Sequence, residues 1–563
     1  MRYSEDALYQ RALKFLLHRT NYENFKSIPY EQMKRSRKRL REFLDYLGAP
    51  EKNFVFIHVA GTKGKGTTCC ALERVYRAAG YRVGLFTSPH LVDVAERFQI
   101  DGKNCDKTLF AETLLRLVEK WKKFAAKKKR EALEQFDSDE DPYVEKMTFF
   151  EWTLVLAVSL FARANVDVAI VEVGLGGRFD ATNVCDADVS VLTSVSYDHC
   201  EQLGNTLLKI AGEKLGIVKT NAPLVCGVGF SRFLRLKNDS EPEPEDNNAN
   251  APEPQNCAQN PDSPDDSSQE KADCEKVARR PFTKAEKMEA IARKKAGEDF
   301  KRQKKALENF DPQTRISEKD LQEVCELAKN TAAERGAPFY QVKALSPFVA
   351  KLPTPPFDSV RRWNFEIALN VVGVLAERTQ IPEGRALKDE NNTGELLRLP
   401  VPKEAIENAA ANFELPCRFE TVSLAPTIVV DGAHNRASVA AFMKAAKERF
   451  PDKKIKILFA ATLGKDVRGM IAEMATTADE VILTQRIKDE RSEPVGDLIQ
   501  TFEQVMDETC DENSLIRRKF RVAPDFASFL TEYAARGPRP DSVLCAIGSF
   551  YFAAQVRETF KKR

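Results

Sequence analysis

Short runs of apolar residues, rich in β-branched and aromatic side chains, recur along the chain and alternate with segments of helical periodicity. Such alternation predicts an α/β fold in which a mostly parallel sheet is covered by helices on both faces. The expected strands are, in chain order, residues 54–60, 82–87, 166–173, 189–194, 224–228, 427–430, 455–460, 481–484 and 543–546.

The length of 563 residues exceeds what a single hydrophobic core usually organises. We therefore expect two domains, and the proline-containing stretch 400–416 marks the junction. The predicted division is 1–410 and 411–563, with the second domain the smaller. Helices are expected within 9–47 and over 67–80, 149–164 and 365–376, where apolar residues recur at helical spacing.

Composition and charge exclude several classes of protein. The net charge of +2 provides no long-range field for nucleic acid, and the hydrophobic fraction of 43% is that of an ordinary soluble protein. We expect no membrane partner, because no segment approaches the roughly 20 apolar residues that span a bilayer. The 12 cysteines are scattered without a C-x-x-C pair, and no secretory signal begins at Met1, so we expect a cytoplasmic protein.

One stretch in the middle of the chain departs from the α/β pattern. Residues 238–275 consist largely of Glu, Pro, Asp, Asn and Ser, which predicts disorder. Residues 276–335 are dense in Lys, Glu and Ala, and we expect a solvated helical insertion there. A basic arm that recruits a partner is the alternative for this second segment.

A glycine-rich loop follows the first predicted strand. It contains Gly61, Gly64, Lys65, Gly66 and Thr67 and leads directly into a helix. Backbone N–H groups at such a helix start can hold phosphates, Lys65 would neutralise the β- and γ-phosphates of ATP, and Thr67 would reach a magnesium ion. The pattern departs from the strict P-loop because Gly66 separates the lysine from the hydroxyl residue. A merely flexible loop is the alternative.

Five sequence motifs occurring together are far more specific than the glycine-rich loop alone. They are HVAGTKGKGTT around the loop, GLFTSPHL at 84–91, VEVGLGGRFDATN at 171–183, SYDH at 196–199 and DGAHN at 431–435. The chain resembles the folylpolyglutamate synthase and dihydrofolate synthase family, part of the Mur ligase superfamily. Lys63 stands where many bacterial members carry Asn. The resemblance implies an N-terminal P-loop-type ATPase domain and a smaller C-terminal α/β, Rossmann-like ligase domain.

Three polar residues lie at or just beyond the ends of predicted strands, and the resemblance assigns them to metal binding. Ser88, Glu172 and His199 would meet at the carboxyl edge of the parallel sheet, where oxygen and imidazole ligands suit magnesium. A buried, paired carboxylate is the alternative for Glu172, and a turn cap is the alternative for Ser88. Two magnesium ions are expected, and a monovalent cation is compatible with the family.

Lys214 stands where the family commonly carries a lysine that is carbamylated by carbon dioxide. The modification would convert an ammonium into an anion that can hold a second magnesium ion. An ordinary lysine on the surface of a helix is the alternative.

The resemblance also implies a pterin pocket and a second group of ATP ligands. The pocket would be lined by Thr148, Phe149, Phe150, Glu151, Phe179, Asp180 and Ala181. On sequence alone, Phe149 and Phe150 are more typical of a core. The ATP ligands would be Asn364, Arg418 and Asp431, although Arg418 lies in PCRF where the family motif is closer to WPGR.

Two residues of the C-terminal half are expected near glutamate or the transferred phosphate. His434 lies in DGAHN and Ser549 in GSFYF. A turn-stabilising role is the alternative for His434.

The implied reaction is ATP-dependent joining of L-glutamate to a folate carboxylate through an acyl phosphate, with Lys65, Lys214 and His434 as catalytic residues. We expect a monomer whose partners are ATP, L-glutamate and tetrahydrofolate, with dihydropteroate as a further acceptor. A Mur-type ligase acting on a cell-wall nucleotide is the rival within the class, and the 84–91 and 171–183 motifs favour folates. A nucleotide-regulated binding module is the rival from another class.

Overall fold

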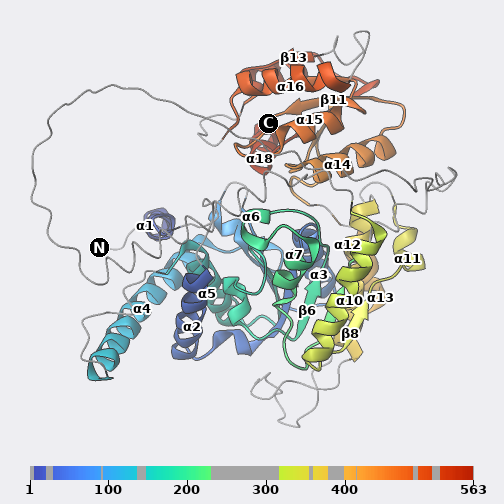
Figure 1. Ribbon diagram of the computed structural model, residues 1–563. Helices are drawn as coiled ribbons and strands as arrows, with labels where there is room; N and C mark the ends of the chain where they lie inside the picture. The colour runs from blue at the N-terminus through green and yellow to red at the C-terminus, as the bar shows by residue number, and fades with distance from the viewer. Residues whose placement is uncertain are drawn as a thin grey trace, which may run out of the picture. The chain divides into compact units, whose positions relative to one another are not determined.

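The computed structural model describes residues 5–20, 30–90, 93–135, 147–229, 316–353, 359–377, 399–411, 413, 415–485, 492–509 and 520–561 (Figure 1). These residues form two mostly parallel sheets with helices packed on them, which confirms the predicted α/β class. The predictions of disorder over 238–275 and of a helix over 276–315 lie outside the described residues.

The first sheet has eight strands in the order β4-β3-β2-β5-β1-β6-β7-β8. Its strands pair in parallel except at β2–β3 and β3–β4. The central strand β1 is buried along its whole length, as expected where helices cover both faces. The strand bounds are β1 Val55–Ala60, β2 Val83–Phe86, β3 Phe98–Ile100, β4 Lys103–Asn104, β5 Val168–Glu172, β6 Val189–Leu192, β7 Leu224–Cys226 and β8 Phe339–Gln341.

Helices from distant parts of the chain cover this sheet. Helices α1, α2, α4 and α5 share a core cluster with Phe56 and Val171 of the strands. Helix α3 packs against β1, β2 and β5 and is itself covered by α12 and α13. The helix bounds are α1 Glu5–Leu17, α2 Tyr30–Tyr46, α3 Lys65–Ala78, α4 Lys107–Gln135, α5 Phe149–Arg163, α6 Cys200–Leu203, α7 Leu207–Leu215, α10 Glu318–Glu334, α11 Pro347–Ala350, α12 Ser359–Glu377 and α13 Lys403–Ala411.

The second sheet has six strands in the order β13-β12-β11-β14-β10-β9, all parallel except β9. Successive residues of β10 enter different cores: Val429 packs with α14, α15 and α16, and Ile428 and Val430 pack with α17 and α18. The bounds are β9 Glu420–Leu424, β10 Thr427–Val430, β11 Lys454–Phe459, β12 Glu480–Leu483, β13 Phe520–Val522, β14 Ser542–Ile547, α14 Arg436–Arg449, α15 Val467–Ala475, α16 Val495–Thr509, α17 Phe526–Ala535 and α18 Phe550–Lys561.

The last part of the predicted insertion is an integral element of the first sheet's packing, so the prediction of a solvated helix was wrong for residues 318–334. Helix α10 buries Leu321, Val324, Ala328 and Ala332 against α7. It begins with a capping box in which Ser317 and Asp320 satisfy each other's backbone N–H groups. The chain then adds β8 in parallel to β7.

All nine predicted strands are present within two residues of their expected bounds. The sequence patterns missed β3, β4, β8, β9 and β13, which are short and largely polar or half-exposed. Among the described residues, none of the helices combines the length and the apolar character needed to cross a membrane.

Candidate active site

The glycine-rich loop connects β1 to α3 at the carboxyl edge of the first sheet. Gly64 has a φ of 85°, in the left-handed region, and α3 begins at the next residue, Lys65. A side chain at Gly61 would collide with Thr193, because an added Cβ would lie 1.9 Å from its Oγ1 atom. The loop therefore needs glycine at both positions to fold against the end of β6.

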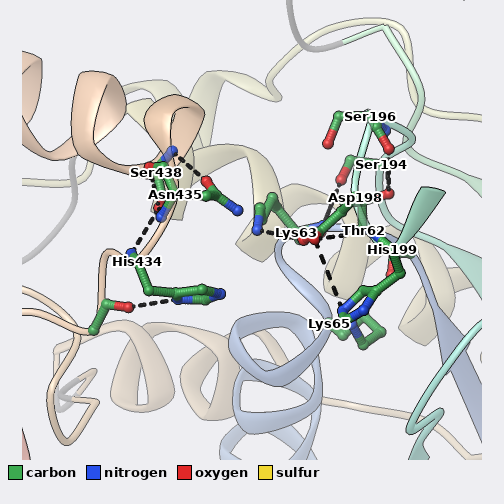
Figure 2. A network of polar contacts seen from close by, with 12 residues as sticks. Thr62, Lys63, Lys65, Ser194, Ser196, Asp198, His199, His434, Asn435 and Ser438 are labelled. Atoms are coloured by element: carbon green, nitrogen blue, oxygen red, sulfur yellow. Dashed lines mark hydrogen bonds and ion pairs between the residues drawn. The ribbon is translucent and has the colours of Figure 1, made fainter. Parts of the chain in front are cut away.

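The loop is ordered by hydrogen bonds to the residues that follow β6. The Lys63 backbone N–H donates to Ser194 Oγ at 2.9 Å, and Thr193 Oγ1 donates to the Lys63 carbonyl at 2.7 Å. The Ser196 N–H donates to Thr62 Oγ1 at 3.1 Å (Figure 2). The alternative of a merely flexible loop does not fit this network.

Two lysines direct their ammonium groups to the same loop carbonyl. Lys65 Nζ and Lys214 Nζ each donate to the Gly61 carbonyl oxygen at 3.1 Å. Lys214 comes from α7 and is only 5% exposed. Burial, together with the positive charge of Lys65, lowers the pKa of Lys214 to about 7. The alternative of an ordinary surface lysine is therefore wrong.

Lys63 forms an ion pair with Asp198, at 2.9 Å, beside the loop (Figure 2). Burial alone would raise the pKa of Asp198, but the charges of Lys63 and His199 hold it below its usual value. His199 immediately precedes α6 and has a φ of 52°, and its Nε2 atom lies 3.8 Å from an Asp198 carboxylate oxygen. Burial lowers the pKa of His199, so the neutral imidazole, which can ligate a metal, is favoured.

The structure brings two of the three predicted metal ligands together. The Ser88 backbone N–H donates to Glu172 Oε2 at 3.1 Å, and Glu172 is 5% exposed at the end of β5. Its carboxylate faces the loop, because an added Cβ on Gly66 would lie 3.5 Å from Oε2. Burial raises the pKa of Glu172, and the neighbouring Lys65 opposes that shift.

His199 is not joined to this pair by a hydrogen bond or an ion pair in the described part of the chain. Over the same residues, no group of three or more His, Cys, Asp and Glu side chains is arranged to hold a metal ion. The predicted set consists of Ser88, Glu172 and His199. Because serine is not one of those four residue types, this set could not form such a group. A buried carboxylate that faces a phosphate-type loop nevertheless fits a hard divalent cation.

The predicted ATP ligand Asn364 lies at the glycine-rich loop. It belongs to α12 and is 5% exposed, and a Cβ on Gly64 would lie 2.2 Å from its Oδ1 atom. The Thr68 hydroxyl donates to its carbonyl oxygen at 3.5 Å. Residues almost 300 positions apart thus meet at one loop.

Thr148 and Glu151 form the capping box that starts α5. Glu151 also accepts from Ser36 and forms a buried ion pair with Arg39 at 3.2 Å. Burial raises the pKa of Glu151, and the Arg39 charge opposes the rise. Thr148 and Glu151, both predicted pocket residues, therefore stabilise the start of α5.

The two phenylalanines of α5 have different surroundings. Phe149 is 1% exposed, and the Arg97 guanidinium lies 5.1 Å from its ring centre. Phe150 is only partly buried and packs its ring against Gly174, where an added Cβ would lie 2.5 Å from Cζ. Phe149 is therefore a core residue, and Phe150 borders the 174–177 loop.

The other predicted pocket residues lie at the end of that loop. Asp180 accepts from the Leu175 N–H at 2.9 Å and from the Thr182 N–H at 3.0 Å, so its carboxylate organises the turn. Phe179 and Ala181 flank it and are both half-buried.

In the second sheet, Asp431 follows β10 and organises the turn that contains His434. Its carboxylate accepts from the Phe419 and Ala433 N–H groups, both at 2.7 Å. Arg418 is half-buried and stacks its guanidinium 3.7 Å from the centre of the Phe550 ring. These two predicted ATP ligands thus lie in one group of loops at the end of β10.

His434 lies in the same group of loops, and a hydrogen bond of its ring defines its tautomer. Its Nδ1 atom lies 2.8 Å from the Gly432 carbonyl oxygen, so Nδ1 carries the proton and Nε2 is the acceptor (Figure 2). Burial lowers its pKa to about 3, which keeps the imidazole neutral. The contact with Gly432 supports the turn-stabilising alternative for Nδ1 and leaves Nε2 for a ligand. Ser549 is 2% exposed and accepts from the Thr462 hydroxyl at 3.2 Å.

Comparisons with known proteins show which proteins this chain resembles. Residues 417–550 match the model of the Mur ligase glutamate ligase domain. A folylpolyglutamate synthase of Arabidopsis thaliana is 46% identical over 168 residues, which cover 30% of this chain and 27% of that protein. A dihydrofolate synthase/folylpolyglutamate synthase of Bacillus subtilis is 26% identical over 448 residues, 79% of each protein. The chain is thus similar to folylpolyglutamate synthases and dihydrofolate synthases, and its residues 417–550 match a domain of Mur ligases.

Solved structures of the folylpolyglutamate synthase family share the fold. A Mycobacterium tuberculosis folylpolyglutamate synthase complexed with ADP has a TM-score of 0.62 at 22% identity and covers 99% of each chain. A Yersinia pestis bifunctional enzyme complexed with AMPPNP and Mn ion has a TM-score of 0.62 at 21% identity and covers 100% of each chain. The sequence matches to the first two curated relatives span 27% and 49% of those proteins.

Sequence reasoning missed a buried arginine beside the family's TSPHL motif. Arg97 is 1% exposed, and its Nε–H donates to His90 Nδ1 at 2.8 Å. That bond makes Nδ1 the acceptor and leaves the His90 proton on Nε2. His90 belongs to the 84–91 motif, but nothing in the sequence indicated that an arginine seven residues later would be buried.

Proposed function

We propose that this chain is an ATP-dependent ligase that joins the amine of L-glutamate to a carboxylate of a folate through an acyl phosphate. The ordered glycine-rich loop carries the proposal, because its backbone and the Lys65 ammonium group form a phosphate-binding arrangement at the carboxyl edge of a parallel sheet, beside the buried Lys214. The relatives' names, which all contain folylpolyglutamate synthase, supply the substrate class.

A carboxylate resists attack by an amine, so it must first be activated. Transfer of the γ-phosphate of ATP to the folate carboxylate gives an acyl phosphate and ADP. The glutamate amine then attacks the carbonyl carbon, phosphate leaves and an amide remains. Lys65 stabilises charge on the transferred phosphate, as in other phosphoryl transfers. No covalent bond to the enzyme is needed.

Ser88, Glu172 and His199 are the proposed metal ligands, and magnesium is the proposed ion, with two ions per site. A divalent cation supplies charge neutralisation between the phosphates and the acceptor carboxylate. Glu172 is suited to this role because its buried carboxylate faces the loop and, among the described residues, accepts one hydrogen bond, from the Ser88 N–H.

Lys214 is proposed to react with carbon dioxide and to hold the second ion as a carbamate. Carbamylation requires a neutral amine, and a pKa of about 7 provides one near neutral pH. The nitrogen forms a bond to the carbon of carbon dioxide and releases one proton. The resulting anion would replace the donor contact to Gly61 with metal-binding oxygens.

The group at the end of β10 is proposed to complete the ATP site and to contact glutamate. Arg418, Asp431 and Asn364 would bind ATP, with closure of the two proposed domains, 1–410 and 411–563, excluding water from the acyl phosphate. Since a pKa of about 3 makes His434 a weak base, we assign its Nε2 atom to hydrogen bonding and positioning. Ser549 is the weaker glutamate contact.

The proposed acceptor pocket is bordered by Phe150, Phe179, Asp180 and Ala181 around the 174–177 loop. The buried Phe149, together with Thr148 and Glu151, would support its wall. Both tetrahydrofolate and dihydropteroate are proposed acceptors. We further propose that the enzyme is monomeric and cytoplasmic.

The decisive experiment is an ADP-release assay with the purified full chain. Tetrahydrofolate and dihydropteroate are supplied in parallel, each with and without L-glutamate, and the products are weighed by mass spectrometry. ADP release that needs both acceptor and glutamate, with one glutamate added to the acceptor mass, is expected. ATP hydrolysis independent of both would contradict the proposal and favour a nucleotide-regulated binding module.

A further inference from the structure

A cationic cavity of about 300 Å³ lies beside the first sheet and plays no part in the reaction described above. Four of its lining residues are Arg37, Arg178, Lys219 and Arg335, and none of the lining residues is acidic. These cations come from α2, from the loop after β5, from the segment after α7 and from the end of α10. Four separate parts of the chain therefore deliver positive charge to one cavity.

Hydrogen bonds of Asn183 connect the residues that line this cavity. Its backbone carbonyl accepts from Lys219 Nζ at 2.8 Å and from an Arg37 Nη atom at 3.5 Å. Its side-chain amide donates to the carbonyls of Arg178 at 3.0 Å and Gly216 at 2.9 Å. Asn183 is 3% exposed, so the centre of this network is buried.

The acids beside the cavity offset only part of its positive charge. Glu213 pairs with Arg178 at 3.2 Å, and Asp186 lies 3.8 Å from Lys219 but is 76% exposed on its side chain. Burial lowers the pKa of Lys219 to about 8 and also lowers the pKa of Arg37. Holding these charges thus costs free energy, which a bound anion with more than one negative charge would offset.

The cavity adjoins the proposed reaction site through two short connections. Phe179 lines the cavity and is also a proposed border of the acceptor pocket. The Arg178 N–H donates to the Glu213 carbonyl at 2.7 Å, and the next residue, Lys214, reaches Gly61 of the glycine-rich loop. A flexible ligand could therefore extend from the acceptor pocket into the cavity.

We propose that this cavity binds the oligoglutamate chain of folates that already carry several glutamates. The inference rests on the proposed function. Each glutamate joined through one of its carboxylates leaves the other as a free anion, so the chain is a flexible ligand with one negative charge per unit. The cavity provides four cationic side chains for such a chain.

The test compares one-glutamate and five-glutamate tetrahydrofolate as acceptors for the full chain. The variants are Lys219→Met and Arg335→Met; Arg335 is exposed, so its replacement should not disturb folding. The KM for the five-glutamate acceptor is expected to rise about tenfold, with kcat and the KM for the one-glutamate acceptor within about twofold of the wild type. Lys209→Met, an exposed lysine on α7 outside the cavity, is the matched control and should change neither KM.

A binding measurement separates this inference from the proposed function. Penta-γ-glutamate, which lacks a pterin, is titrated calorimetrically into the wild type and the variants, and pyrophosphate is titrated in a second arm. Weaker binding of penta-γ-glutamate by both variants would support the cavity even if no ligation is detected. Equal binding by wild type and variants, or cavity-dependent binding of pyrophosphate alone, would overturn the inference.

Discussion

At the scale of single residues, burial decides the chemistry that each proposed catalytic group can perform. Lys214 has a pKa of about 7 because it is buried beside another lysine, so it can act as a neutral nucleophile. His434 has a pKa of about 3 and is a neutral acceptor. Neither state could be assigned from the residue type, since unperturbed lysine and histidine titrate near 10.4 and 6.5.

Replacement of Glu172 by Gln tests the metal assignment. The amide oxygen can still accept from the Ser88 N–H, so the fold should persist, but the negative charge that faces the loop is lost. We expect kcat/KM for ADP release to fall about 10²- to 10³-fold. The thermal unfolding midpoint should stay near that of the wild type.

The matched control is Glu323→Gln on the exposed face of α10, which should keep full activity. Near-wild-type ligation by Glu172→Gln would show that this carboxylate serves only to cap the loop after β2.

The pKa of Lys214 predicts how carbamylation and activity depend on pH. The native state favours the neutral amine above about pH 7, whereas the unfolded chain binds the proton up to pH 10.5, so the free energy of unfolding rises with pH across that window. In ¹³C-bicarbonate, a carbamate signal should appear above pH 7 and fade below it, together with ligase activity. Lys214→Gln should lack both the signal and the activity.

A carbamate signal that persists unchanged in Lys214→Gln would assign the modification to another lysine. Activity that stays constant in carbon dioxide-free buffer would remove the carbamate from the mechanism.

At the scale of elements, sequence patterns identified the buried strands and failed at the edges. The run at 427–430 is apolar after Thr427 because both faces of β10 are covered, and its bounds were predicted as the structure has them. Strand β4 contains only Lys103 and Asn104, both exposed, and leaves no hydrophobic signal. In α10, many charges obscured Leu321, Val324, Ala328 and Ala332, whose helical spacing did indicate a buried face.

The site was predictable as a set of motifs but not as a geometry. The five motifs contain the glycine-rich loop and the proposed ligands Ser88, Glu172, His199 and Asp431, whereas Asn364 and Arg418 lie outside them. The meeting of Lys214 with Gly61 joins positions 153 apart in the sequence, and the contact of Asn364 with Gly64 joins positions even further apart. Such contacts follow from strand order in the sheet, which local periodicity does not specify.

The packing of α10 predicts that two neighbouring substitutions differ in effect. Val324 is 0% exposed, and Val324→Ala should lower the free energy of unfolding by about 2 kcal/mol, because two buried methyl groups are lost and a small cavity remains. Glu323→Ala on the exposed face should change it by no more than about 0.5 kcal/mol. Denaturant titration of both variants provides the comparison, and equal midpoints would contradict the buried packing of α10.

At the scale of the whole molecule, the position of α10 and β8 changes which part of the chain can be removed. Residues 316–341 complete the packing against α7 and the edge of the first sheet. The expectation of a solvated insertion over residues 276–335 therefore does not hold for its last part.

Two deletions test this boundary. Removal of residues 238–311 with a short flexible linker should keep at least half of the ligase activity. Removal of residues 238–335 should expose the apolar face of α7 and give an insoluble or unfolded product. Light scattering and the ADP-release assay measure both outcomes, and a soluble, active product of the longer deletion would contradict the assignment of α10 to the core.

The parallel pairing of β8 with β7 also affects how the chain emerges from the ribosome. Strand β7 ends at Cys226, and its partner begins at Phe339. At synthesis rates of about 5–20 residues per second, the edge of β7 stays unpaired for on the order of 5 to 20 s before β8 has been synthesised. An unpaired strand edge can accept a strand from another chain, so nascent copies on one polysome have an interval in which they can pair wrongly. Translation speed between these two strands should therefore influence the yield of soluble protein.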